Sequence, residues 1–189
     1  MANRQDQSNP RRASHSVPIA LQREATRATA GIRVTSPHID AGASIPERHT
    51  EYGEGRAPAL RWKPVGGARS YAVLVEDPDA PTAEPFVHWL AWNIPPDMHE
   101  LPEDIRADTE PRAPSGIRQG RNDRGSIGWF GPRPPAGDAP HHYHFQVLAL
   151  DAMLDLEEGA TRDELLRTID GRVIAKGELV ATSEAPTQQ

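Results

Sequence analysis

Two carboxylates and a histidine lie close together in the segment "DPDAPTAEPFVHW". Asp77 and Asp79 are two residues apart, and His88 opens an apolar run that reads as a strand. A carboxylate beside a histidine can bind a ligand, hold a divalent metal ion or act as an acid–base pair. Taken alone, the Asp-Pro and Ala-Pro steps of this segment describe only a turn, because Asx side chains can satisfy their own backbone. The segment therefore offers binding, metal and catalytic chemistry as well as a purely structural role.

A second polar group opens a later strand, in "GPRPPAGDAPHHYHF". In an extended chain His141, Tyr143 and Phe145 share one face, while His142 and His144 share the other. If the first face is the buried one, His141 and Tyr143 are the polar members available for chemistry. Proline fixes φ and removes backbone donors, so the approach to this strand should form a stiff wall. A stiff wall that carries a few polar groups suits a small-ligand site.

The elements that must position these groups are short strands. Six apolar runs separated by Pro- and Gly-rich segments read as strands, namely Ile32–Thr35, Ala59–Lys63, Ser70–Glu76, Val87–Asn93, Tyr143–Leu150 and Glu178–Thr182. Asp77 directly follows the run "SYAVLVE", which is apolar on both faces, as a central strand should be. The end of a central strand is a common place for a pocket floor, so Asp77 is the first candidate for a site residue.

Helical signals are few. "GATRDELLRTIDG" combines a capping box of Thr161 and Glu164 with Gly171 as the C-terminal cap, which predicts one helix between them. A further short helix is expected near residues 19–29. With 19 prolines and 15 glycines in 189 residues, the composition favours a β-sandwich with elaborated loops over a helical bundle. The long Pro-rich connection that follows residue 94 is expected to be functional or mobile.

The chain divides into a tail, one domain and a short C-terminal extension. Residues 1–30 carry five arginines against two acidic side chains and lack strand alternation, so they are predicted to be a polar, basic, disordered leader. Residues 31–183 form the predicted domain, and residues 184–189 form a C-terminal tail.

Composition excludes several classes of protein. The absence of cysteine excludes disulfides, thiolate metal sites and cysteine nucleophiles. The N-terminal residues lack the apolar region of a signal peptide, and no run approaches the roughly 20 apolar residues of a membrane span, so we expect a cytoplasmic protein without a transmembrane segment. The net charge of −6 argues against a nucleic-acid partner.

These motifs together resemble the phosphatidylethanolamine-binding protein (PEBP) family, which includes the Raf kinase inhibitor protein. "DPDAP", "VHW" and "GPRPPAG…HHYHF…ALD" carry the resemblance, which is strongest to the shorter bacterial and archaeal branch. "VTSPHIDAGASIPERHTEYGEG…PALRW", "QGRNDRG" and "AKGELVAT" extend it over residues 31–183. The resemblance implies a mainly β fold, a Greek-key β-sandwich with one or two peripheral helices, and a small preformed anion pocket.

The resemblance also implies the site residues. By direct motif match, the predicted ligand-binding residues are Asp77, His88, His141 and Tyr143, with Asp79, Gly131 and Pro135 as wall residues from the same motifs. The implied ligands are phosphate, phosphoryl head groups, acetate and similar small anions, without a cofactor or a metal. On this resemblance, the chain is not expected to be an enzyme. A homodimer stays open, because members of the bacterial branch are often dimers.

Three features depart from the family pattern. The usual "H-R-Y" is His141-His142-Tyr143, which replaces a fixed positive charge by a titratable one. Trp129 and Phe130 stand where "G-Y-x-G-P" is common, which changes what part of a ligand the pocket accepts. The long C-terminal helix of the eukaryotic members is missing, so their kinase-regulatory role is not carried over.

A carboxylate in an anion pocket needs a hydrogen-bond partner, because two like unit charges about 4 Å apart repel each other by roughly 4 kcal/mol at an effective dielectric near 20. An unpaired Asp77 would therefore repel the anion. We predict that Asp77 accepts a hydrogen bond from one histidine and raises the pKa of that histidine. The second histidine and the hydroxyl of Tyr143 should then donate to the anion. Because imidazole ordinarily titrates near pH 6.5, anion affinity should be greatest in mild acid and fall above neutrality.

Two alternatives stay open beside the anion-binding hypothesis. The carboxylates and histidines could form a metal site or serve a hydrolase, although the chain has no H-E-x-x-H, G-x-S-x-G or P-loop motif. The chain could instead be a protein-interaction or inhibitor module, whose pocket reads an acidic or phosphorylated group of an unidentified protein target.

Overall fold

The computed structural model of the chain describes residues 18–105 and 116–186. Its elements, in chain order, are the 3-10 helices η1 (Ala20–Gln22) and η2 (Glu24–Thr26), strands β1 (Ala30–Gly31) and β2 (Val34–Thr35), 3-10 helix η3 (Glu47–His49), strands β3 (Leu60–Trp62), β4 (Ser70–Asp77), β5 (Phe86–Ile94), β6 (Glu100–Leu101), β7 (Arg118–Gln119) and β8 (His141–Leu150), helix α1 (Arg162–Ile169) and strand β9 (Val173–Ser183). No helix among these is long and apolar enough to cross a membrane.

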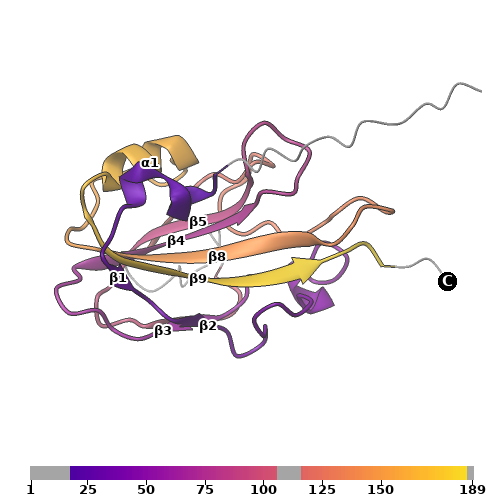
Figure 1. The fold of residues 1–189 in the computed structure, drawn as a ribbon, viewed down its shortest axis with the longest axis horizontal. Helices are drawn as coiled ribbons and strands as arrows, with labels where there is room; N and C mark the ends of the chain where they lie inside the picture. Colours follow the sequence, from indigo (N-terminus) through magenta and orange to yellow (C-terminus); the bar gives the residue numbers. More distant parts are fainter. Residues whose placement is uncertain (1–17, 106–115, 187–189) are drawn as a thin grey trace, which may run out of the picture.

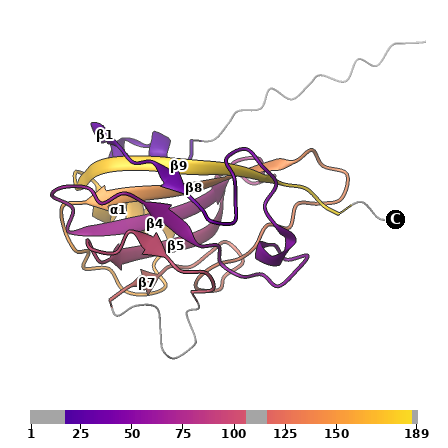
Figure 2. The same cartoon turned by 90° about the horizontal axis from the view of Figure 1, so that it is seen from below.

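The described strands form two sheets (Figure 1). The larger sheet has the order β1-β9-β8-β4-β5-β7, which Figure 2 shows from below, and the smaller sheet has the order β2-β3-β6. β1 runs parallel to β9, and the other neighbours in both sheets are antiparallel. Helix α1 and the N-terminal 3-10 helices cover one face of the large sheet, while the small sheet covers the other. The fold is therefore a mainly β sandwich with a helical layer outside it.

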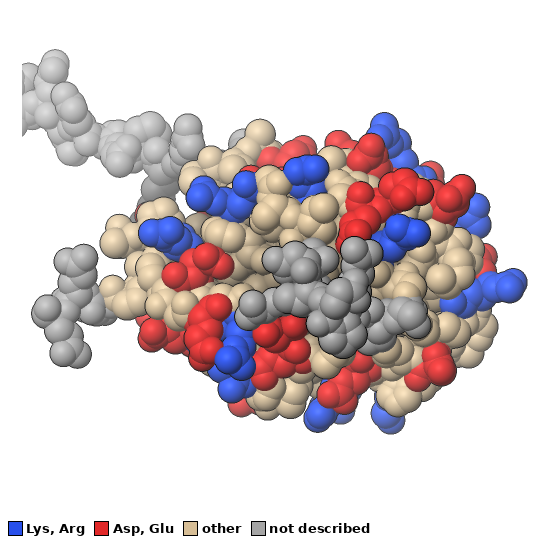
Figure 3. Space-filling view, turned by 180° about the vertical axis from the view of Figure 1, so that it is seen from behind, with Lys and Arg blue, Asp and Glu red and all other residues tan. Residues whose placement is uncertain are grey.

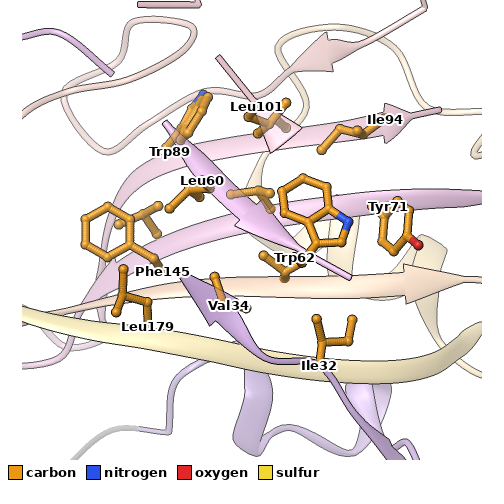
Figure 4. Close-up of a cluster of buried hydrophobic side chains, with 14 of the residues drawn as sticks. Ile32, Val34, Leu60, Trp62, Tyr71, Trp89, Ile94, Leu101, Phe145 and Leu179 are labelled. Carbon is orange, nitrogen blue, oxygen red and sulfur yellow. The ribbon is translucent and has the colours of Figure 1, made fainter. Parts of the chain in front are cut away.

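Strand β4 lies between β8 and β5 in the large sheet, and its side chains alternate between the cores on the two faces of that sheet. Val73 and Val75 pack toward the small sheet, where Leu60 and Trp62 meet them in the larger core, part of which Figure 4 shows. Ala72 and its neighbours on the opposite face pack beneath helix α1. All eight residues of β4 are buried, which confirms the prediction of a central strand that is apolar on both faces.

Helix α1 begins where its capping residues predict. The hydroxyl of Thr161 accepts from the backbone of Glu164, while the Glu164 carboxylate accepts from the backbone of Thr161. The buried Leu165, Leu166 and Ile169 pack against the large sheet in the second core cluster. The expected capping box and apolar stripe are therefore confirmed.

Residues 18–30, which the sequence placed within the leader, pack onto the large sheet. The buried carboxylate of Glu76 on β4 accepts hydrogen bonds from the backbone of Ala20 and from the side chains of Gln146 and Arg162. Lys176 donates to the carbonyl of Leu21. A buried carboxylate needs such donors, and the N-terminal segment supplies one of them. Residues 1–17 and 187–189 of the predicted leader and tail lie outside the described residues.

The six predicted strands correspond to β2, β3, β4, β5, β8 and β9. The last begins at Val173, five residues earlier than predicted, because its whole length pairs with β8. Pairing also sets the position of the candidate site. Glu76 lies opposite His144 on β8, and Asp77 lies opposite Phe86 on β5. The end of β4, the start of β5 and the start of β8 therefore meet at the same end of the sheet, in its central part.

Candidate functional site

The turn after β4 holds Asp77 in one orientation. Its Oδ1 accepts hydrogen bonds from the backbone N–H of Asp79 at 2.8 Å and of Ala80 at 3.1 Å. Such an Asx turn is what the Asp-Pro-Asp segment predicts on its own. Because Oδ1 is engaged in the turn, Oδ2 is free to point across to β8.

His141 meets Asp77 from the first position of β8. Its Nδ1 donates to Oδ2 of Asp77 over 2.8 Å, and both side chains are buried. Burial raises the pKa of Asp77, against the opposing effect of the His141 hydrogen bond. The predicted hydrogen bond between a histidine and Asp77 is confirmed. The other ring nitrogen of His141, Nε2, lies 3.6 Å from the carboxylate of Asp138.

His88 lies on β5, and its hydrogen bond differs from the one we expected. Its Nδ1 lies 2.7 Å from the carbonyl oxygen of Phe130, which can only accept, so Nδ1 carries the proton. Burial lowers the pKa of His88 to about 4, although the Phe130 carbonyl opposes the shift. Near neutral pH the ring is therefore neutral, and Nε2 is a hydrogen-bond acceptor. The expectation that this second histidine donates to an anion is wrong for the neutral ring.

Tyr143 completes the polar group from β8. Its ring packs edge-on against the ring of His88, with the centroids 5.1 Å apart. The side chain is buried, and burial, reinforced by the charge of Asp77, raises the pKa of its hydroxyl far above the ordinary value. The phenol therefore stays protonated and can donate a hydrogen bond. The alternation of β8 agrees with the prediction, because Tyr143 is buried while His142 on the other face is exposed.

These four side chains share one cavity of about 380 Å³. Its lining combines polar groups from three strands with aromatic and proline side chains, namely Asp77, Ala80, Pro81, Thr82, Phe86, His88, Arg124, Phe130, Arg133, Pro134, Pro135, His141 and Tyr143. Pro135 thus lies in the wall, as the sequence predicted. A cavity of this size with a few converging polar groups is typical of a small-ligand site.

Two predicted residues lie outside this lining. Asp79 turns toward His142 and accepts hydrogen bonds from its backbone N–H and from its Nδ1, both over 2.8 Å. Gly131 lies where the chain passes close to a neighbouring segment, and a Cβ there would stand 2.8 Å from the carbonyl oxygen of His49. The structure therefore gives both residues a role in positioning loops. His142, one of the departures from the family pattern, ties β8 to the turn that holds Asp77.

Two arginines in the lining were not predicted from the sequence. Arg124 lies with its guanidinium 5.3 Å from the ring centroid of Phe130, and Arg133 follows Gly131 in the Pro-rich loop. Both are exposed, so they lie at the mouth of the cavity. Their segments, "QGRNDRG" and "GPRPP", were singled out as motifs. Sequence alone does not tell which charged side chain of a loop turns inward.

One cluster of the described residues has metal-ligand spacing, and its members are not among the residues that line the cavity. Candidate ligand atoms of His38, His49 and Glu103 all lie within 4.8 Å of one another. The guanidinium of Arg48 already approaches this cluster, with Nε 3.2 Å from Nε2 of His49 and 3.4 Å from the Glu103 carboxylate. Because an arginine occupies the place that a cation would take, we assign this cluster a structural role.

The charges on the surface are mixed. On the face turned away from Figure 1, acidic and basic side chains of the described residues are interspersed (Figure 3). This face therefore lacks, within the described part of the chain, the broad basic surface that nucleic-acid binding requires.

Comparison with known proteins places this geometry in a wider group. The sequence model of the phosphatidylethanolamine-binding protein family matches residues 35–184. A UPF0098 protein of Pyrococcus abyssi is 47% identical over 141 residues, which cover 74% of this chain and 78% of the relative. The UPF0098 protein YbcL of Escherichia coli is 42% identical over 127 residues, which cover 64% of this chain and 69% of YbcL.

Two solved structures share the fold. The crystal structure of E. coli YbcL, described as a new member of the mammalian PEBP family, aligns with a TM-score of 0.78 at 35% identity, covering 83% of this chain and 100% of YbcL. The PEBP homologue from Chlamydia trachomatis aligns with a TM-score of 0.73 at 34% identity, covering 84% of this chain and 100% of that protein. The mainly β sandwich predicted from the sequence agrees with both.

Proposed function

The chain belongs to the phosphatidylethanolamine-binding protein family, and on this premise we propose that its cavity binds the phosphoryl or carboxylate group of a small anionic ligand. The observation that carries the proposal is the convergence of Asp77, His88, His141 and Tyr143, from three strands, on one cavity. These are the residues that the resemblance to the family implied.

The charges around the cavity support an anion despite the carboxylate of Asp77. Nδ1 of His141 donates a hydrogen bond to Oδ2 of Asp77, which partly offsets the repulsion between this carboxylate and an anion. Arg124 and Arg133 at the mouth contribute two positive charges. The protonated hydroxyl of Tyr143 is a neutral donor inside the cavity. An anion that enters therefore meets positive charge at the mouth and a hydrogen-bond donor within.

We propose binding without catalysis because the reactive groups of the cavity are engaged or held neutral. Burial keeps the Tyr143 hydroxyl protonated, so it is a poor nucleophile. Both oxygens of Asp77 accept hydrogen bonds within the protein. His88 is the remaining candidate base, but its depressed pKa of about 4 makes it a weak acceptor of protons.

A calorimetric titration with inorganic phosphate tests the proposal. Replacing the hydroxyl of Tyr143 in Tyr143→Phe removes a charge-assisted hydrogen bond worth about 1.5–3 kcal/mol, so the affinity should fall roughly 10- to 100-fold. The matched control is His144→Gln, one position further on β8, because His144 pairs with Glu178 outside the cavity and should not affect binding. Equal affinity of Tyr143→Phe and the wild type would contradict the proposal.

A second candidate follows from the size of the cavity, which exceeds that of a lone phosphate. The aromatic side chains of Phe86 and Phe130 line it beside the two arginines, so the anionic group could belong to a larger molecule, including a partner protein. Capture of a phosphorylated or acidic protein by the wild type, and its loss in Tyr143→Phe, would favour this candidate. Capture that survives the substitution would point to a surface outside the cavity.

A further inference from the structure

We propose that the cavity selects an anion that carries its own proton: a phosphomonoester in its singly protonated form, in preference to a phosphodiester or sulfate. This inference rests on the proposed function and specifies the chemical class of its ligand. It follows from the direction of the hydrogen bonds inside the cavity.

His88 sets the direction of one of these hydrogen bonds. Its Nδ1–H is committed to the carbonyl of Phe130 over 2.7 Å, so the neutral ring can only accept at Nε2. That carbonyl is fixed in turn, because the backbone N–H of Phe130 donates to the carbonyl of His88. The loop and the strand thus form a reciprocal pair around the ring. The tautomer of His88 is determined by the backbone and does not depend on a ligand.

Nε2 of His88 stays open to the cavity. It makes no hydrogen bond with the described residues. It is nevertheless not fully buried, because it is absent from the side-chain atoms that are both fully buried and unpartnered. His88 is 3% exposed overall and lines the cavity, so this nitrogen reaches solvent through the cavity. A ligand that fills the cavity removes this solvent, and the nitrogen then needs a donor from the ligand.

The other polar groups around the cavity offer the complementary half of the pattern. The hydroxyl of Tyr143, which burial keeps protonated, lines the cavity and is a donor. The remaining charged groups nearby are Arg124 and Arg133 at the mouth, Asp138 at 3.6 Å from His141, and Asp79, which is paired with His142. None of these donates to Nε2 of His88 in the described structure.

A singly protonated phosphoryl group satisfies both halves at once. Its unprotonated oxygens accept from the hydroxyl of Tyr143, and its P–O–H group donates to Nε2 of His88. Sulfate and a phosphodiester present only acceptors, which would set oxygen lone pairs against that nitrogen. The alternative is to protonate His88, and with a pKa of about 4 only about one ring in a hundred is charged near pH 6.

The test is a calorimetric titration of the full-length protein near pH 6, where a phosphomonoester is about half singly protonated. The probes are inorganic phosphate, methyl phosphate, dimethyl phosphate, sulfate and glycerophosphoethanolamine. Dimethyl phosphate represents the diester link of a phospholipid, and glycerophosphoethanolamine adds the ammonium of its head group. Phosphate and methyl phosphate should bind at least about tenfold more tightly than the other three, which corresponds to about one well-made hydrogen bond.

The matched variant is His88→Asn. Its amide N–H₂ takes the place of Nδ1 and can still donate to Phe130, but no atom replaces Nε2. The preference for phosphate over sulfate should disappear. If the variant does not fold, a pH series on the wild type with methyl phosphate replaces it. The affinity for methyl phosphate should then fall as the pH rises above about 6, because its doubly charged form has no P–O–H group, while sulfate binding stays weak.

The outcomes separate this inference from the proposed function. Failure of every probe to bind would overturn both. Equal binding of phosphate, sulfate and dimethyl phosphate would overturn the selection and leave anion binding intact. Tighter binding of glycerophosphoethanolamine than of methyl phosphate would assign the donor to an ammonium group and refute a phosphomonoester ligand. A preference that persists in His88→Asn would show that His88 does not impose it.

Discussion

Asp77 and His141 lie 64 positions apart in the chain and share a buried hydrogen bond of 2.8 Å. The bond joins the last residue of β4 to the first residue of β8, two strands that are neighbours in the large sheet. It orients the imidazole and gives the carboxylate a hydrogen-bond donor within the protein. The same carboxylate also holds the turn that forms one side of the cavity. Asp77 therefore connects the fold to the candidate site.

Removing Asp77 should cost stability, whereas removing Asp79 should not. In Asp77→Ala two backbone N–H groups and His141 lose their acceptor, so the free energy of unfolding should fall by about 2 kcal/mol. In Asp79→Ala a partly exposed pair with His142 is lost, at a cost of about 0–1 kcal/mol. Urea denaturation of the two variants measures the difference. Equal losses would show that the turn does not depend on Asp77.

The buried His88 should make stability depend on pH in mild acid. Its pKa is lowered to about 4 in the folded chain from about 6.5 in the unfolded chain. Between these values the unfolded state binds more protons, so stability falls as the pH falls from 6.5 to 4. The loss from this residue should reach about 3 kcal/mol, at 1.36 kcal/mol for each pKa unit.

The His88→Asn variant isolates this contribution. Burial lowers the pKa of His49 as well, and burial raises the pKa of Asp77, but both effects remain in the variant. Chemical denaturation at several pH values should therefore show a shallower acid loss for His88→Asn than for the wild type. Parallel pH profiles would mean that His88 titrates normally in the folded chain.

Gly131 should be required for packing and not for contact with a ligand. A Cβ at this position would stand 2.8 Å from backbone atoms of His49 and Thr50, so Gly131→Ala should destabilise the fold by roughly 1–3 kcal/mol. Gly66→Ala is the control, because no atom lies within 4 Å of a Cβ there, and its effect should stay within about 0.5 kcal/mol. Thermal unfolding compares the two, and an unaffected Gly131→Ala protein would refute the close approach.

Glu76 should anchor residues 18–30 to the sheet. Glu76→Gln leaves the buried guanidinium of Arg162 without its closest counter-charge, so the free energy of unfolding should fall by about 3 kcal/mol. Glu178→Gln removes a more exposed pair with His144 and should cost less than about 1 kcal/mol. Limited trypsin digestion should also cleave earlier after Arg23 in Glu76→Gln. Unchanged stability and cleavage would mean that the segment docks without this carboxylate.

Much of the fold can be predicted from local sequence patterns. The two-faced apolar run of β4, the alternation in β8 and the capping box of Thr161 each specify an element through short-range chemistry. The N-terminal segment is harder to predict, because the buried Ala20 packs in a core formed by distant residues and bonds to Glu76, which lies 56 positions away. No pattern within residues 18–30 indicates that contact.

The site is predictable in its membership but not in its hydrogen bonds. The motifs bring together Asp77, His88, His141 and Tyr143, which the structure places around one cavity. The donor and acceptor roles depend on the carbonyl of Phe130, which fixes the tautomer of His88 from a distant loop. Asp79 is the opposite case. Its motif predicted a position in the cavity wall, but its carboxylate accepts a hydrogen bond from His142 outside the lining.

The most direct test of the central claim is a crystal structure of the protein grown with phosphate. We predict density for one anion in the cavity, within hydrogen-bond distance of the Tyr143 hydroxyl and of Nε2 of His88. An empty cavity at saturating phosphate, with the anion bound elsewhere on the molecule, would contradict the account.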